Sequence, residues 1–243
     1  MRLLWILLGL ISASPALADQ VRVAVAANFT APARELATLF KARSGHEVVL
    51  SFGSSGQLFA QITQAAPFDV FLSADAERPE RLVRERLAAA DSRFTYSIGK
   101  LILWSRDRRA EAGELALRQP FEKIAIANPA AAPYGGAALD VLRNLGLLEQ
   151  LRRRIVQGTS IAQTFQFVES GNAELGFIAL SQLEGRTDGG RWLVPPALHG
   201  SLQQDAVLLT RGQGNKAATE FLNFLKSTEA RALISRFGYE LAP

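Results

Sequence analysis

The sequence contains no cysteine. A chain without thiols forms no disulfide, carries no thiolate nucleophile and cannot build a thiolate metal site. Its acidic and basic residues nearly balance, and the formal net charge of +4 at pH 7 is too small and dispersed to indicate a nucleic-acid partner. The two histidines, His46 and His199, lie between predicted elements. We therefore expect both at the surface, not as catalytic bases.

Long hydrophobic runs are also missing. The apolar run at residues 3–11 is well short of the roughly 20 residues that a membrane span needs. It follows Arg2 and precedes the small-x-small sequence Ala16-Leu17-Ala18, an arrangement typical of a secretory signal peptide. We expect residues 1–18 to be a signal peptide cleaved after Ala18. The rest of the chain would then be exported to a Gram-negative periplasm.

Charged residues are absent from four junctions where a predicted strand gives way to a predicted helix. The clearest, residues 51–57, has the sequence Ser-Phe-Gly-Ser-Ser-Gly-Gln; the others are residues 26–30, 132–136 and 158–162. Glycines allow tight turns, and serines supply hydroxyl donors beside the unpaired N–H groups of a helix start. Helix N-termini attract anions. Four uncharged, donor-rich starts therefore predict an anion pocket without a metal and without a fixed positive charge.

Strand-like and helical patterns alternate along the chain. Strands are expected at 21–26, 48–52, 68–73, 96–104, 123–127, 155–156, 175–179 and 203–210, and helices at 30–43, 57–65, 77–89, 135–145, 161–170, 216–225 and 229–237. This alternation predicts an α/β fold of two domains, each with a mixed, mostly parallel sheet flanked by helices.

The two predicted domains are not separated by a flexible linker. We expect extended crossovers near residues 96–101 and 203–207, so that lobe 1 comprises residues 19–97 plus 206–243 and lobe 2 residues 98–205. A ligand would lie in the cleft between the lobes, outside the carboxyl ends of the strands, where helix N-termini gather.

Five segments occur in an order that resembles a known family. They are residues 24–29 (AVAANF), 51–56 (SFGSSG), 69–75 (DVFLSAD), 128–135 (NPAAAPYG) and 175–180 (LGFIAL). From Val21 to Leu241 the chain resembles the periplasmic molybdate-binding proteins of ABC import systems, which are type II solute-binding proteins. The resemblance implies a non-enzymatic, monomeric receptor without a cofactor. It would capture molybdate or tungstate in the interdomain cleft and deliver it to an ABC permease in the inner membrane.

The resemblance also implies an oxyanion site made of helix-start N–H groups and hydroxyls. The positions that it implies are Ala27, Asn28, Ser54, Ser55, Tyr134 and Ile161. Tyr134 and Ile161 would act through their backbone N–H groups. Ala27 and Ser54 are the neighbours of the principal contacts in the first two loops.

One position departs from the family pattern. Many members place a tyrosine hydroxyl on the ligand shortly after a Leu-Gly motif. Here that position is Ala179, which has no side-chain donor. Asn28 stands where those members have a serine, and this pairing resembles the branch of the family that uses Asn28 instead.

A site that offers only donors distinguishes anions by their protonation. Molybdate, tungstate and sulfate are fully deprotonated near neutral pH. Phosphate keeps a proton, and no Asp or Glu in the four junctions can accept it. Such an unmatched buried pair costs about 1–3 kcal/mol, or about one to two decades in affinity.

Two alternative functions stay open at this point. A receptor for sulfate or another tetrahedral oxyanion has the same donor chemistry, because the sequence does not set the size of the cavity. An exported serine hydrolase using Ser55 is more distant. The nucleophile-elbow pattern requires glycine two residues after the serine, and Gln57 stands there.

Overall fold

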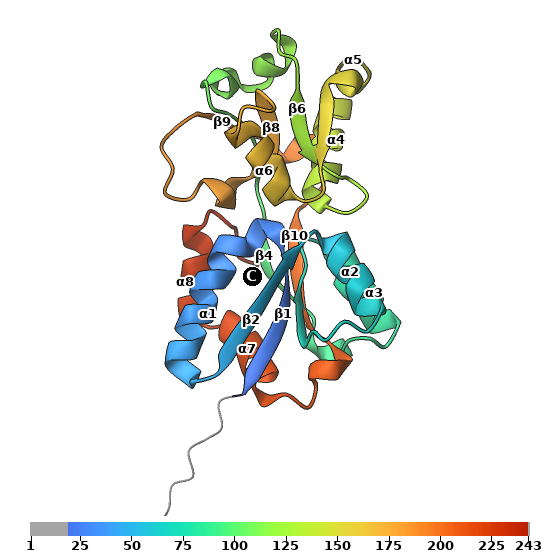
Figure 1. Ribbon diagram of the computed structural model, residues 1–243, viewed down its shortest axis with the longest axis vertical. Helices are drawn as coiled ribbons and strands as arrows, with labels where there is room; N and C mark the ends of the chain where they lie inside the picture. Colours follow the sequence, from blue (N-terminus) through green and yellow to red (C-terminus); the bar gives the residue numbers. More distant parts are fainter. Residues whose placement is uncertain (1–18, 243) are drawn as a thin grey trace, which may run out of the picture.

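The computed structural model describes residues 19–242, so the predicted signal peptide, residues 1–18, lies outside the described residues. The described chain forms two α/β lobes stacked along the long axis of the molecule (Figure 1). Each lobe is built on one five-stranded sheet. The predicted α/β architecture of two domains is confirmed.

Sheet 1, in the first lobe, has the strand order β2-β1-β3-β10-β4. Its strands are β1 (Gln20–Ala26), β2 (Glu47–Gly53), β3 (Val70–Leu72), β4 (Phe94–Ile98) and β10 (Gln203–Leu208). β1 pairs in parallel with β2 and β3, whereas β10 is antiparallel to β3 and β4. Only β10 therefore runs against the other four strands, so the sheet is mixed and mostly parallel, as predicted.

Sheet 2, in the second lobe, repeats this plan with the order β7-β6-β8-β5-β9. Its strands are β5 (Leu101–Ser105), β6 (Ile124–Ala127), β7 (Ile155–Gly158), β8 (Leu175–Ala179) and β9 (Gly190–Leu193). β6 is parallel to β7 and β8, and β5 is antiparallel to β8 and β9. In each sheet the antiparallel strand is the one through which the chain enters from the other lobe.

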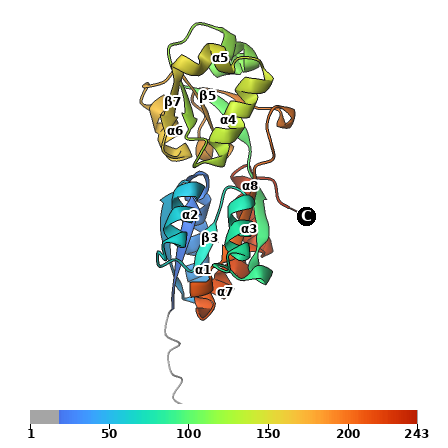
Figure 2. The same cartoon turned by 90° about the vertical axis from the view of Figure 1, so that its right-hand side faces the viewer.

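Helices cover both faces of each sheet (Figures 1 and 2). The α-helices are α1 (Thr30–Ser44), α2 (Ser55–Thr63), α3 (Glu77–Arg84), α4 (Pro133–Asn144), α5 (Leu148–Leu151), α6 (Ile161–Glu169), α7 (Lys216–Leu225) and α8 (Thr228–Arg236). The 3-10 segments are η1 (Ala27–Phe29), η2 (Ala90–Ser92), η3 (Arg109–Arg118, interrupted at Gly113), η4 (Arg152–Arg154), η5 (Leu180–Leu183), η6 (Pro196–Leu198) and η7 (Thr210–Gly212).

The core of the first lobe follows from the alternation of side chains along β1. Val23 and Val25 pack on the face covered by α1, α7 and α8, whereas Ala24 packs on the face covered by α2 and α3. Successive strand residues point to opposite faces. From Val23 to Ala26 every residue of β1 is apolar and buried, so this part of the strand is covered on both sides, and its carboxyl end is left as the edge where polar loops can gather.

The first crossover corrects one prediction. The stretch 96–104, predicted as one strand, is divided between β4 in sheet 1 and β5 in sheet 2. At the break, the Gly99 N–H donates to the Leu202 carbonyl at 2.9 Å, so the two crossovers are bonded to each other. A Cβ at Gly99 would clash with the Tyr134 hydroxyl. The chain changes sheets where only glycine fits.

The return crossover lies earlier than predicted. β10 pairs with β4 from Gln203, which stands opposite Ile98, so the crossover occupies residues 194–202, between β9 and β10. The predicted crossover at 203–207 and the predicted lobe boundary at 205/206 fall inside a strand of sheet 1. The sequence does not reveal where β10 begins, because its first residues are polar. Gln204 and Asp205 are nevertheless buried in the strand. The pattern also does not predict β9 or α5.

Candidate functional site

A small cavity lies between the lobes at the point where four helical segments begin. It is lined by Ala26, Ala27, Asn28, Ser54, Ser55, Ala74, Ala132, Pro133, Tyr134 and Ile161. Its volume is about 10 Å³, and no charged residue is among those that line it. All six positions implied by the family resemblance lie in its wall. The structure thus brings together residues that are up to 134 positions apart in the chain.

The sheet order explains why these segments meet. β1, β2, β6 and β7 are followed by η1 with α1, α2, α4 and α6, respectively. The strands of each pair are parallel neighbours, so both helices of a lobe start at the same edge of its sheet. The first N–H groups of each helix have no partner within the helix. The cavity therefore lies at the positive ends of several helix dipoles.

Ser54 and Ser55 have different roles. Ser54 is the N-cap of α2: its Oγ accepts from the Gln57 N–H, and the Gln57 side chain accepts from the Ser54 N–H at 3.2 Å and from its hydroxyl at 2.9 Å. Ser55 Oγ instead accepts from the Ala74 N–H at 2.9 Å. This leaves the Ser55 hydroxyl proton available to donate into the cavity.

The side-chain amide of Asn28 does not donate into the cavity, because its hydrogen bonds go to other residues. Its Nδ2 donates to Gln204 Oε1 at 2.9 Å and to the Tyr239 hydroxyl at 3.0 Å. Its carbonyl accepts from the hydroxyls of Ser181, at 2.8 Å, and Tyr239, at 2.9 Å. With its side-chain amide nitrogen and its carbonyl held, Asn28 has its backbone N–H, in the first turn of η1, to offer to the cavity.

Tyr134 and Ile161 are the contributions of the second lobe. Tyr134 is the second residue of α4, after Pro133, and Ile161 is the first residue of α6, so both N–H groups are unpaired within their helices. The Tyr134 ring is buried and its hydroxyl accepts from Gln204 Nε2 at 3.3 Å. The Ser160 side chain accepts from the Gln163 N–H, so it caps the start of α6.

A buried polar network lies directly behind the cavity. The chain has three tyrosines, and the hydroxyls of Tyr96, Tyr134 and Tyr239 all belong to this network around Gln204 and Asn28. Burial raises the pKa of each of these tyrosines above its ordinary value, and the nearby phenols raise the pKa of Tyr96 and Tyr134 further. All three therefore remain neutral across the physiological pH range.

Further bonds hold the lobes together at the rim of the cavity. The Gly56 N–H donates to the Ala131 carbonyl at 2.8 Å. Arg78, on α3, forms an ion pair with Asp75 and donates through Nη2 to the Ala130 carbonyl at 3.2 Å. These contacts join the first lobe to the loop before α4, so the cleft is closed in this structure.

Sequence reasoning missed the residues that support the site. Gln204, Tyr239 and Ser181 touch Asn28 without lining the cavity. Ala74 lines the cavity and donates to Ser55. One signal was available: Gln203, Gln204 and Asp205 are three consecutive polar residues before an otherwise apolar run.

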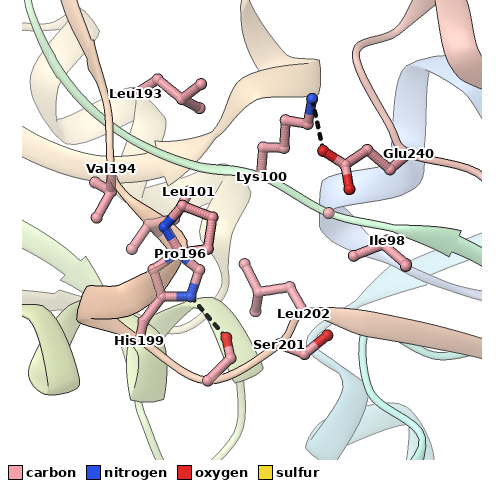
Figure 3. Close-up of a pocket in the computed structure, with 12 residues that line it drawn as sticks. Ile98, Lys100, Leu101, Leu193, Val194, Pro196, His199, Ser201, Leu202 and Glu240 are labelled. Atoms are coloured by element: carbon pink, nitrogen blue, oxygen red, sulfur yellow. Dashed lines mark hydrogen bonds and ion pairs between the residues drawn. The ribbon is translucent and has the colours of Figure 1, made fainter.

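A larger cavity, of about 390 Å³, lies on the crossovers. Figure 3 shows its largely apolar wall, in which Lys100 pairs with Glu240 at 3.0 Å. It does not bring the four helix starts together. Within residues 19–242, no cluster of three or more His, Asp or Glu side chains could hold a metal ion, and no helix is long and apolar enough to span a membrane.

The comparisons with known proteins agree with this geometry. Residues 21–240 match the family of bacterial extracellular solute-binding proteins. The chain is 49% identical to the molybdate-binding protein ModA of Rhodobacter capsulatus, over 93% of this chain and 90% of the relative. It is 47% identical to ModA of Azotobacter vinelandii, over 94% and 93% of the two chains.

Solved structures are also similar to this chain over most of its length. The periplasmic molybdate-binding protein of Azotobacter vinelandii has a TM-score of 0.87 at 40% identity, covering 92% of this chain and all of that one. The sulfate-binding protein SubI of Mycobacterium tuberculosis, with a TM-score of 0.76 at 13% identity over 92% of this chain and 87% of that one, shares the fold. With its two lobes, its uncharged cleft and a family match over nearly the whole described chain, this protein belongs to the bacterial extracellular solute-binding proteins.

Proposed function

We propose that this protein captures molybdate, and also tungstate, in the periplasm and delivers it to an ABC importer in the inner membrane. Its two relatives at 47–49% identity are molybdate-binding proteins, and the similar solved structure is a periplasmic one. The signal peptide would direct export and be cleaved after Ala18.

The observation that carries this proposal is the uncharged, donor-lined cavity between the lobes. The Ser55 hydroxyl and the N–H groups of η1, α2, α4 and α6 can surround one tetrahedral ion. Each hydrogen bond to a charged group contributes about 1.5–3 kcal/mol. A micromolar affinity corresponds to about −8 kcal/mol, so several such bonds exceed it and offset the costs of desolvation and closure.

The absence of an acceptor disfavours phosphate. No carboxylate is among the residues lining the cavity, and the hydroxyl of Ser54 already donates to Gln57. The proton that phosphate carries at neutral pH would therefore find no carboxylate to accept it. Sulfate has the same charge and no proton, so only its smaller size separates it from molybdate, and it is the second candidate ligand.

The hydrolase alternative loses support from the surroundings of Ser55. The side-chain partner of Ser55 is the Ala74 N–H, which cannot accept a proton. His46, which the sequence placed at the surface, is instead buried, because its ring packs between the Asp19 N–H and Glu220, away from Ser55. His199 bonds the Gly200 carbonyl at the larger cavity. Neither histidine is placed to act as a base for Ser55.

Calorimetric titration of residues 19–243 with molybdate, tungstate, sulfate and phosphate tests the proposal. We expect molybdate and tungstate to bind with micromolar or tighter affinity, without added metal, and to displace sulfate. Phosphate should bind at least tenfold more weakly. Tight binding of sulfate with weak binding of molybdate would make the protein a sulfate receptor.

A further inference from the structure

Gln204 contacts both halves of the candidate site. It lies on β10, at the start of the strand by which the chain returns to sheet 1, and its exposed fraction is 0%. Its Oε1 accepts from Asn28 Nδ2 at 2.9 Å, and its Nε2 donates to the Tyr134 hydroxyl at 3.3 Å. Asn28 belongs to the first lobe and Tyr134 to the second, and both line the cavity.

The backbone is shaped to hold this side chain. The pairing of β10 with β4 shifts register between Gln204 and Asp205, an irregularity that re-aims side chains. Asp205 is anchored by Arg93 at 2.9 Å and by Thr95 at 2.8 Å. A Cβ at Gly99 would lie 2.6 Å from Gln204 Nε2, so glycine leaves the space that the amide occupies.

The remaining polar groups fix the orientation of this amide. The Tyr96 hydroxyl is 3.1 Å from Gln204 Oε1 and 3.1 Å from the Ser73 carbonyl. With Asn28 donating as well, Oε1 lies between two donors and Nε2 faces an acceptor. Because an unsatisfied buried group is costly, this arrangement restrains Asn28 and Tyr134 relative to each other.

We propose that Gln204 is a positioning residue that couples the two lobes' contributions to the anion site, through its bonds to Asn28 in one lobe and Tyr134 in the other. It touches no ligand. It holds the two helix starts at the spacing that a tetrahedral oxyanion bridges, and so stabilises the closed, loaded form. This inference rests on the proposed function, because it assumes that an oxyanion occupies the cavity.

The coupling predicts a kinetic signature that a merely structural role lacks. The open form can bind molybdate before the two helix starts reach their final spacing. The association rate constant should therefore change little when Gln204 is replaced. Escape requires the lobes to separate, so the dissociation rate should rise. A general loss of stability would lower the melting temperature of the free protein, but it would not raise the dissociation rate while leaving the association rate unchanged.

The chain offers a matched control at the preceding position. Gln203 is exposed, and its side chain bonds Thr95 and Asp205, both within the first lobe. Gln204→Met keeps the length of the side chain and removes its hydrogen bonds, and Gln203→Met makes the same change one residue away. Tyr134→Phe removes a single hydroxyl while leaving the Tyr134 backbone N–H in place.

The test is stopped-flow and calorimetric binding of molybdate to the wild type and these variants. We expect Gln204→Met to weaken binding at least tenfold, mainly through faster dissociation, and Gln203→Met to stay within twofold of the wild type. Tyr134→Phe should weaken binding about fivefold. The double variant should bind within twofold of Gln204→Met, because both changes break the same bond.

The outcomes separate this inference from the proposed function. If the wild type binds molybdate and Gln204→Met behaves like Gln203→Met, the coupling role of Gln204 is overturned and the proposed function stands. If Gln204→Met does not fold, Tyr134→Phe decides alone, and an unchanged dissociation rate contradicts the inference. If none of molybdate, tungstate or sulfate binds the wild type, both fall.

Discussion

The backbone N–H of Gly56 donates to the carbonyl of Ala131 across the cleft, at 2.8 Å. Gly56 lies in the first turn of α2, and Ala131 lies in the loop before α4. A Cβ at Gly56 would lie 2.9 Å from Ala131 Cα. The absence of a side chain therefore lets two of the four helix starts approach each other closely enough to enclose the cavity.

The first prediction concerns this contact. Gly56→Ala should weaken molybdate binding by about 1–3 kcal/mol, the usual cost of overpacking, because the added methyl group keeps the lobes apart. Calorimetry gives the affinity, and small-angle X-ray scattering should show a smaller decrease in radius of gyration on adding molybdate. Gly214→Ala, where an added Cβ meets no atom within 4 Å, should leave both unchanged. Equal effects of the two variants would argue against the closure role.

The second prediction concerns Arg78, which reaches across the rim of the cavity. Its side chain is 22% exposed, so its bond to Ala130 is partly screened by solvent and contributes only about 1 kcal/mol. Arg78→Ala should therefore speed molybdate dissociation about fivefold. Arg81, on the same helix, pairs with Glu85 within the first lobe, so Arg81→Ala should leave the dissociation rate unchanged. A faster rate in both variants would point to a general effect on α3.

The third prediction separates the two serines. Ser55→Ala should weaken oxyanion binding by about 1.5–3 kcal/mol, because it removes a hydroxyl donor to a charged ligand. Ser54→Ala should instead lower the free energy of unfolding by about 1 kcal/mol through loss of the N-cap, with a smaller change in affinity. Calorimetry and denaturant titration measure the two quantities. The opposite assignment of effects would make Ser54 the ligand contact.

The fourth prediction concerns alkaline pH. An exposed tyrosine in the unfolded chain loses its proton near pH 10, whereas burial raises the pKa of Tyr96, Tyr134 and Tyr239 in the folded protein. Below pH 10 both states keep their protons and stability is unaffected. Above it only the unfolded state releases them, so the free energy of unfolding should fall as pH rises.

Absorbance of tyrosinate checks this directly. Because all three tyrosines of the chain are buried, the tyrosinate signal should appear together with the loss of secondary structure. Tyr96→Phe should show a shallower decline of stability above pH 10 than the wild type. Ionisation of a tyrosine in the intact fold near pH 10 would contradict the buried network.

Local patterns predicted the elements that carry the site, because each depends on nearby residues. The helix at 216–225 has the predicted bounds, and all four uncharged junctions do begin helical segments. The split of 96–104 between two sheets could not be read locally. It depends on the approach of Tyr134 to Gly99, and these residues are far apart in the sequence.

The candidate site was predictable to the level of its loops but not of its atoms. Ala27 and Ser54 do lie at the cavity, as the sequence implied. The sequence could not show that Asn28 turns its amide toward Gln204, because that bond requires the return strand to lie behind the first loop. Consecutive polar residues at the start of an apolar strand run are the signal to weigh in such cases.

The central claim is that neutral donors from both lobes enclose one oxyanion. A crystal structure of the protein with molybdate, with the metal located by its anomalous scattering, tests it most directly. We predict a single molybdenum peak in the cavity, with its oxygens within hydrogen-bonding distance of Ser55 Oγ and of the backbone nitrogens of Asn28, Tyr134 and Ile161. A peak elsewhere, or one that requires a cation or charged side chain beside it, would contradict the account.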